Sequence, residues 1–181
     1  TVVLSAFTTK CAVYVLARGF PGTELLIYVG AAMAAFPLFY AAIENDLRRV
    51  LAYSLNNQLG FMVVGVGVGS ALAINGVAAH AFAHILYKSL LFMAMGAVLY
   101  RVGTVKASEL GGLYKSMPLT TIFCIIGAAS ISTPLFAGFI AKSLTLSATA
   151  KDGYPVIWLI LMFASAGVFL VSGVKIVYFA F

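Results

Sequence analysis

Long apolar stretches separated by short polar breaks divide this chain along its whole length. A helix needs about 20 apolar residues to cross a hydrocarbon core of roughly 30 Å. The pattern therefore predicts an all-α, polytopic membrane helix bundle with about six transmembrane helices. Their expected ranges are 2–17, 25–43, 50–68, 75–100, 118–147 and 155–181. The breaks are too short for a soluble domain, so residues 1–181 are predicted to form one membrane domain.

The composition agrees with this reading and excludes a soluble protein. The chain is 63% hydrophobic and only 9% charged, and its mean hydropathy is +1.09. Its net charge of +6 is dispersed between the spans, which favours membrane topology over nucleic-acid binding. Breaks on one side carry more basic residues than those on the other, which places the richer side in the cytoplasm. These residues are Arg48, Arg49, Arg101, Lys106 and Lys115, against Arg18 and Lys151.

No residue pattern indicates a cofactor, a metal ion or a catalytic site of the chain's own. Cys11 and Cys124 both lie within predicted spans, where neither a disulfide framework nor a metal site has support. CxxC, HExxH and glycine-rich phosphate-binding motifs do not occur. We therefore expect no cofactor and no metal.

The segment 75–100 holds the most informative side chains. His80, His84 and Lys88 are spaced i, i+4 and i+8, so a helix places them on one face about 6 Å apart along its axis. An ionisable group inside hydrocarbon costs roughly 2.5–3.5 kcal/mol on insertion scales. Burial for packing is the alternative, but three such groups on one face favour a function. Histidine gains and loses a proton near neutral pH, so this face can pass protons through water.

The positions of the acidic residues favour protons over a metal cation. All five fall in breaks or at span ends: Glu24, Glu44, Asp46, Glu109 and Asp152. Hard cations prefer carboxylate and carbonyl ligands, and a lysine ammonium offers no lone pair. A cation site would need carboxylates from other segments or partner subunits.

The segment 118–147 is predicted to be broken at Pro134, which removes a backbone donor and clashes with the preceding turn. Transporters place broken helices along their ion pathways. Lys142 follows two turns later and is a candidate for taking up or releasing protons, with snorkelling as the alternative. Neighbouring hydroxyls can satisfy freed carbonyls and a glycine allows close approach. The broken-helix residues are Ser130, Ser132, Thr133, Pro134 and Gly138.

Three other polar features allow more than one interpretation. Lys10 is a further intramembrane lysine, and its spacing supports a functional and a structural role equally. The polar run 53–58, which includes Asn57 and Gln58, indicates hydrogen bonding to waters or helices, or simple interhelical packing. Lys175 lies near the end of the last span, where snorkelling to the interface is expected.

Several motifs resemble the antiporter-like subunits shared by respiratory complex I and Mrp-type cation/proton antiporters. Asp46-Leu-Arg-Arg-Val-Leu-Ala-Tyr-Ser54, followed by Gln58-Leu-Gly-Phe-Met62, is similar to one signature of that family. His80-x3-His84-x3-Lys88-Ser-Leu-Leu-Phe92 resembles its central His/Lys helix. The stretch from Glu109 to Pro118, followed by Pro134-Leu-Phe-x-Gly-Phe-x-x-Lys142, resembles its broken helix and terminal lysine.

The resemblance covers essentially the whole chain and looks closest to the D subunit of Mrp-type antiporters. It implies a larger parent built from two inverted repeats, of which this chain would be the second half. It also implies that Lys10 lies next to a mid-membrane polar axis and that His80, His84 and Lys88 lie along that axis. Lys142 would stand at the exit half-channel.

The resulting hypothesis is a proton-translocating subunit of a multisubunit monovalent cation (Na⁺)/H⁺ antiporter. Protons would move along Lys10, His84 and Lys88 toward Lys142. Its expected partners are other membrane subunits, protons, Na⁺ and the lipid bilayer, and its expected location is a bacterial inner membrane. One alternative is a pump subunit of a complex I-type NADH:quinone oxidoreductase. The other is a structural membrane scaffold.

Overall fold

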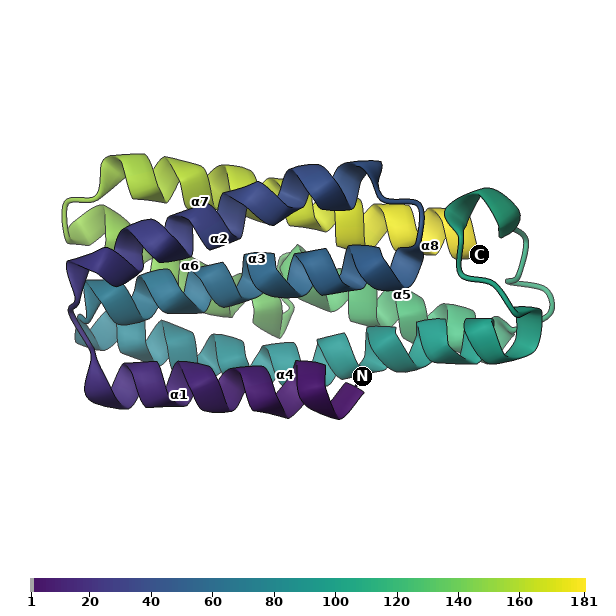
Figure 1. Ribbon diagram of the computed structural model, residues 1–181, viewed down its shortest axis with the longest axis horizontal. Helices are drawn as coiled ribbons and strands as arrows, with labels where there is room; N and C mark the ends of the chain where they lie inside the picture. Colours follow the sequence, from purple (N-terminus) through teal and green to yellow (C-terminus); the bar gives the residue numbers. More distant parts are fainter. Residues whose placement is uncertain (1) are drawn as a thin grey trace.

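The computed structural model describes residues 2–181, and this part of the chain folds into helical rods that lie side by side (Figure 1). The first rod joins a π-helix, η1 (Leu4–Thr8), to α1 (Thr9–Gly19). The next three are α2 (Glu24–Ile43), α3 (Leu47–Val68) and α4 (Ala71–Val102). The fifth consists of α5 (Pro118–Ser132) and α6 (Ala137–Lys151). The sixth runs through α7 (Pro155–Val168), a π-helix η3 (Phe169–Val174) and α8 (Lys175–Ala180).

All six predicted segments are confirmed as helical, and the chain is a polytopic helical membrane bundle. Four stretches are long and apolar enough to cross a membrane: Glu24–Ile43, Ala71–Val102, Pro118–Lys151 and Pro155–Ala180. α1 is too short for that criterion, and the polar run in α3 lowers its hydropathy. The two π-helices were not predicted, because an inserted residue leaves the apolar pattern unchanged.

α3 occupies the middle of the bundle. It packs against α1, α2, α4, α6, α7 and η3, so its polar residues Ser54, Asn57 and Gln58 are buried within the protein. Asp46 begins this helix as its N-cap and accepts hydrogen bonds from the backbone amides of Arg48 and Arg49. The helix ends at Gly69, whose positive φ of 70° suits glycine. A buried position explains how a span this polar is accommodated.

Small residues bring α2 and α3 into close contact. A Cβ atom at Gly60 would collide with backbone atoms of Ala34 and Gly30, and one at Gly30 would lie 2.7 Å from the amide nitrogen of Val64. Glycines permit this approach because they carry no side chain between the two backbones. The approach places the side chains of α3 within reach of the backbone of α2.

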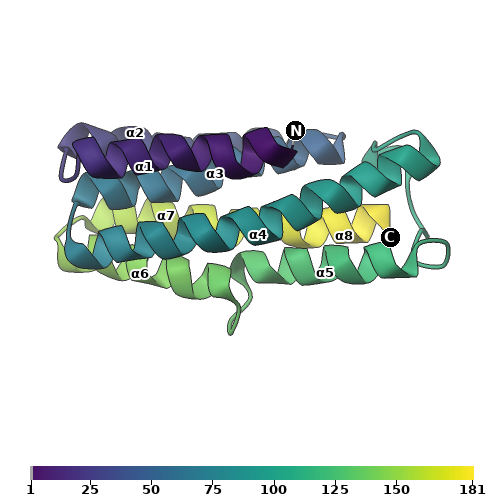
Figure 2. The ribbon, with the colours of Figure 1, turned by 90° about the horizontal axis from the view of Figure 1, so that it is seen from below.

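The break at Pro134 is confirmed, and Figure 2 shows the connection projecting from the bundle between α5 and α6. Thr133 ends α5, and Leu135 adopts a positive φ of 76°. A Cβ at Gly138 would collide with the carbonyl oxygens of Ser130 and Ile131. Gly138 therefore lets the start of α6 lie directly against the end of α5.

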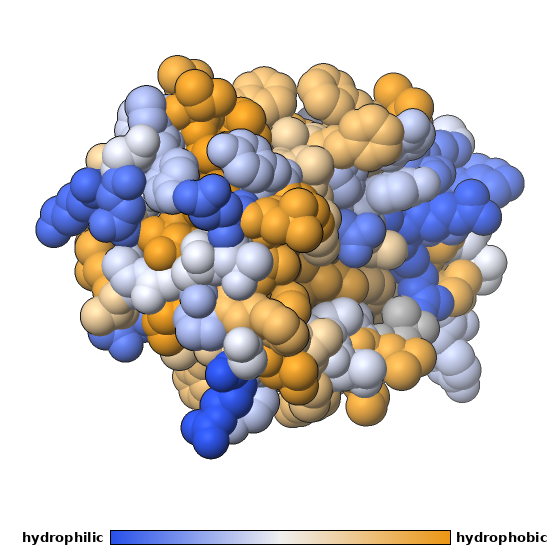
Figure 3. Space-filling view, turned by 60° about the vertical axis from the view of Figure 1, so that its left-hand side comes forward, coloured by the Kyte–Doolittle hydropathy of each residue, from blue (hydrophilic) through white to orange (hydrophobic). Residues whose placement is uncertain are grey.

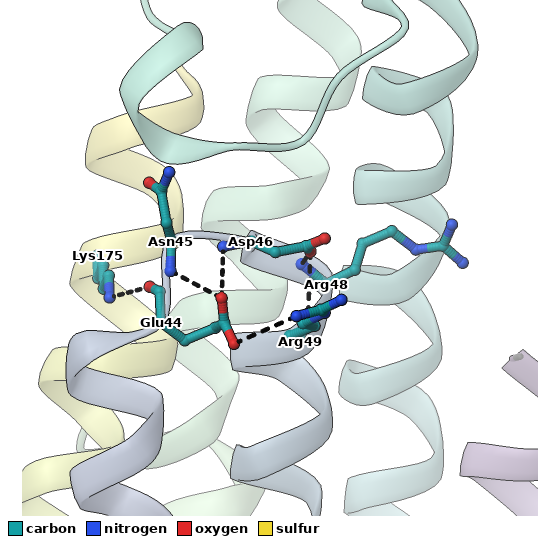
Figure 4. A network of polar contacts seen from close by, with 6 residues as sticks. All are labelled: Glu44, Asn45, Asp46, Arg48, Arg49 and Lys175. Atoms are coloured by element: carbon teal, nitrogen blue, oxygen red, sulfur yellow. Dashed lines mark hydrogen bonds and ion pairs between the residues drawn. The ribbon is translucent and has the colours of Figure 1, made fainter.

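A polar network ties α2, α3 and α8 together at one end of the bundle (Figure 4). The Lys175 amine donates hydrogen bonds to the backbone carbonyls of Ala41, Ala42 and Glu44 at 3.1, 2.9 and 2.7 Å. These carbonyls lie at the C-terminal end of α2, where helical partners are lacking. Lys175 therefore caps the end of α2.

The loop after α4 closes over the same end. Asp46 and Lys106 form an isolated antiparallel bridge, and Ala107 donates its backbone N–H to the Asn45 carbonyl at 2.9 Å. Hydrogen bonds from Thr104 and Lys106 lower the pKa of the exposed Glu109 carboxyl below its usual value. The loop therefore keeps its carboxylate charged beside Lys106.

The outer surface of the bundle is largely apolar. Large exposed side chains include Phe36, Phe39, Phe82, Phe163 and Tyr178, which come from three different spans. Figure 3 shows broad hydrophobic areas between separate groups of hydrophilic side chains. Such a surface suits lipid and neighbouring membrane subunits rather than water.

We expect Gly60→Ala to destabilise the protein, because the added methyl group meets backbone atoms that cannot move aside. Overpacking of this kind costs about 1–3 kcal/mol. The thermal unfolding midpoint of the full-length protein in detergent measures the effect. Gly96→Ala is the matched control, since nothing lies within 4 Å of its Cβ position. Equal midpoints for the two variants would contradict the close α2–α3 contact.

Candidate functional site

Two helices supply most of the polar interior. On α3, Ser54, Asn57 and Gln58 lie on one face at helical spacing. On α4, His80, His84 and Lys88 form the facing row, and α3 and α4 pack against each other. The site is thus a polar seam between two helices inside an apolar shell.

The structure buries all five basic residues of the predicted proton path. The exposed fractions are 7% for Lys10, 0% for His80 and His84, 1% for Lys88 and 2% for Lys142. Polar groups buried this deeply need partners inside the protein or bound water.

Ser54 is the hydrogen-bond partner of Lys88. The Lys88 amine donates to the Ser54 hydroxyl, and it lies 5.9 Å from the centroid of the Phe92 ring. The Ser54 hydroxyl in turn donates to the carbonyl of Leu51 at 3.1 Å. The polar run on α3 is therefore more than packing, since one of its members satisfies a buried amine.

His80 and His84 lie next to each other with ring centroids 6.2 Å apart. His80 Nε2 lies 2.8 Å from the side-chain oxygen of Gln58, whereas His80 Nδ1 has no hydrogen-bond partner among the described residues. Neither ring nitrogen of His84 has one there either. Three buried imidazole nitrogens are thus open to water or to another proton carrier.

Lys142 and His80 share a phenylalanine as a neighbour. The Lys142 amine donates to the Ser132 hydroxyl at 2.6 Å and lies 5.6 Å from the centroid of the Phe61 ring. The His80 ring centroid is 6.0 Å from that of Phe61. Phe61 is fully buried, so its apolar ring contacts both the histidine and the lysine inside the bundle.

The structure also places a cavity of about 250 Å³ beside Lys142. Ser132, Ser143 and Ser165 contribute hydroxyl groups to its lining. A second cavity, of about 320 Å³, lies between α1 and α4 and is lined by both Lys10 and Arg18. Each of these two lysines therefore borders space large enough for several water molecules.

Lys10 binds within its own rod rather than to the histidines. Its amine donates to the Ser5 carbonyl at 3.0 Å and to the Thr9 hydroxyl at 3.1 Å. Ser5 belongs to η1, whose wider turn packs against α4. Insertions of this kind are frequent at functional sites.

The residues of the broken helix do different things. Ser130 donates to the carbonyl of Ile126, four residues earlier within α5, at 2.8 Å, so it does not satisfy a carbonyl that Pro134 frees. Ser132 instead receives the Lys142 amine. The Thr133 carbonyl accepts from the backbone N–H of Phe136 at 3.2 Å. The break is thereby connected to Lys142 through Ser132.

Some members of the site escaped prediction. Phe61 neighbours both His80 and Lys142, and Tyr87 packs against His84 with ring centroids 5.1 Å apart. Aromatic side chains are common in apolar spans, so neither carried a distinguishing signal. Gln58 could have been found from the sequence, because it follows Ser54 by one helical turn and so lies on the same face of α3, toward α4.

The site contains no grouping that would hold a metal. Within residues 2–181, no three His, Cys, Asp or Glu side chains come close enough together to bind an ion. The chemistry of the seam is that of amines, imidazoles, amides and hydroxyls, all of which can exchange or orient protons.

The chain matches the family described as NADH:quinone oxidoreductase/Mrp antiporter, TM, over residues 1–169. It belongs to this family. A solved structure, the Mrp complex from Dietzia sp. DQ12-45-1b, is similar with a TM-score of 0.76 and 32% identity. That similarity covers 85% of this chain and 18% of the other. The resemblance seen in the sequence is thereby confirmed at the level of the family.

The curated relatives include subunits of two kinds of dehydrogenase or oxidoreductase. NADH-ubiquinone oxidoreductase chain 5 of Strongylocentrotus purpuratus is 31% identical over 160 residues, covering 87% of this chain and 24% of the relative. F(420)H(2) dehydrogenase subunit L of Methanosarcina mazei is 36% identical over 138 residues, covering 71% and 20%. The chain thus spans about a quarter or less of the length of these relatives. It is a membrane antiporter-like subunit of the Mrp and complex I type, a family whose relatives belong to multisubunit assemblies.

We expect Ser54 and Lys88 to be strongly coupled. Ser54→Ala leaves the buried amine without this partner and should destabilise the protein by about 1–3 kcal/mol or more. Adding Lys88→Met removes the amine as well, so the double variant should recover much of that stability. Unfolding midpoints of the two single variants and the double variant measure the coupling. Strictly additive effects would contradict the contact.

Proposed function

We propose that this chain is part of a proton-translocating subunit of a multisubunit monovalent cation (Na⁺)/H⁺ antiporter. Protons would move along Lys10, His84, Lys88 and Lys142, and His80 would take part beside them. The observation that carries the proposal is the pair of fully buried histidines with three ring nitrogens that lack a partner among the described residues. A structural histidine is normally hydrogen-bonded, whereas a proton carrier needs an open lone pair.

The surroundings of the histidines support a path with two accessible ends. Lys10 borders one cavity together with Arg18, and Lys142 borders another that carries three serine hydroxyls. Neighbouring positive charges disfavour simultaneous protonation, so loading one site would drive a proton from the next. In this proposal the chain is a part of the second half of its subunit. The membrane is a bacterial inner membrane, and the end rich in basic residues faces the cytoplasm.

The likeness to the Mrp complex favours the antiporter reading. The named respiratory relatives support a second candidate, a proton-pumping membrane subunit of a complex I-type NADH:quinone oxidoreductase. The chemistry of the seam would be the same in both. What differs is the coupling, which would be exchange for Na⁺ in one case and electron transfer in partner subunits in the other.

Lys88→Ala and Lys142→Ala in the full-length subunit, within its assembled complex, should each abolish proton transport. Loss of a proton-transfer group typically costs about 100-fold or more in rate. Complexes reconstituted in liposomes with an internal pH dye measure the flux. Lys151→Ala is the matched control, because Lys151 is exposed at the end of α6. Normal flux in either interior variant contradicts the proposal, and normal flux after neutralising all five basic residues supports the scaffold alternative.

A second measurement separates the two couplings. In liposomes that hold the assembled complex and an imposed pH gradient, added Na⁺ should dissipate the gradient without NADH or a quinone. A complex I-type pump would instead build a gradient on addition of NADH and quinone, and it would not respond to Na⁺. The second pattern would overturn the antiporter assignment while leaving the proton path in place.

A further inference from the structure

Two buried amides on α3 form a chain of hydrogen bonds whose direction is determined at one end. Asn57 and Gln58 are each 1% exposed. The Asn57 side-chain nitrogen donates to the carbonyl of Ala34 on α2 and lies 3.4 Å from the carbonyl of Ala164 on α7. Carbonyl oxygens only accept hydrogen bonds. The Asn57 atom that faces them must therefore be the nitrogen, because the reversed amide would bring three oxygens together.

This orientation passes to Gln58. With its nitrogen against the carbonyls, Asn57 presents its oxygen to Gln58, whose side-chain nitrogen donates to it at 3.0 Å. The Gln58 oxygen then faces α4. There it accepts from the Tyr87 hydroxyl at 3.3 Å and lies 2.8 Å from His80 Nε2. An amide oxygen carries no hydrogen, so His80 Nε2 must be the donor.

We propose that Asn57 and Gln58 are positioning residues that hold neutral His80 as its Nε2–H tautomer and reserve Nδ1 as the atom that takes up a proton. Nδ1 is buried and has no partner among the described residues, as this role requires. In a neutral histidine, the hydrogen bond made by one ring nitrogen determines which of the two nitrogens carries the proton. The inference rests on the proposed function only in treating His80 as a proton carrier.

The fixed tautomer of His80 gives the two histidines different roles. A histidine relays a proton when one ring nitrogen accepts while the other releases, and Gln58 cannot accept a proton from Nε2 under ordinary conditions. His80 therefore gains a proton at Nδ1 from a protonated water or a neighbouring acid, forms an N–H bond there, and returns it from the same atom. His84 has two open nitrogens and can pass protons through its ring. His80 is thus a holding site beside the route, and His84 lies on it.

Solid-state ¹⁵N NMR of the full-length subunit in its complex, labelled at histidine and embedded in lipid, reads the tautomer directly. The His80 signals are assigned by their loss in His80→Gln. In the wild type we expect the signal of an unprotonated ring nitrogen at Nδ1 when His80 is neutral. In Gln58→Leu the single tautomer should be lost and signal from Nδ1–H should appear. Asn57→Leu should have the same effect, because Gln58 is then free to turn.

Asn56→Leu is the matched control, since Asn56 is the exposed neighbour on the same helix and should leave the tautomer unchanged. Neutral wild-type His80 in the Nδ1–H form overturns the inference even if a variant fails to fold. An unchanged tautomer in folded Gln58→Leu also overturns it. Proton flux is measured on the same samples. If the wild-type complex shows the single Nε2–H tautomer of His80 but moves no protons, the proposed function is refuted. The inference about the tautomer then still holds.

Discussion

Hydrocarbon offers no hydrogen-bond partners, and the arrangement of this bundle follows from that constraint. A span as polar as α3 is stable in a membrane only when other helices surround it. Here it touches nearly every other rod, and its amides and hydroxyls are matched to groups on α2, α4 and α7. The same constraint directs buried basic side chains of the other rods to partners within the protein: Lys88 and His80 find theirs on α3, and Lys142 finds its partner on α5.

These hydrogen bonds form only between helices that lie close together, and glycines permit that close approach. Because Gly30 and Gly60 bring α2 and α3 into backbone contact, the short side chain of Asn57 reaches a main-chain carbonyl. α4 approaches α6 in the same manner, since a Cβ at Gly76 would lie 2.9 Å from the Thr145 hydroxyl oxygen. Small residues and polar residues therefore act together: the first determine how near the helices lie, and the second use that proximity.

Much of this structure could be predicted from the sequence, and the parts that could not share a cause. Helix positions, the break at Pro134 and the common face of His80, His84 and Lys88 depend on local spacing, which is visible in the chain. The cap that Lys175 places on α2 joins groups more than 130 residues apart. The contacts of Phe61 with His80 and Lys142, like the direction of the Gln58 amide, are likewise set by other helices. Local patterns carry no information about such partners.

The bond between Lys175 and the end of α2 bears on how the last rod unfolds. α8 has only six residues and follows a π-helix, so by itself it would be a marginal helix. Three hydrogen bonds connect it to the end of α2, a helix that is itself in close contact with α3. Two parts of the chain more than 130 residues apart are thereby coupled, because α8 cannot move away from the bundle without breaking these bonds.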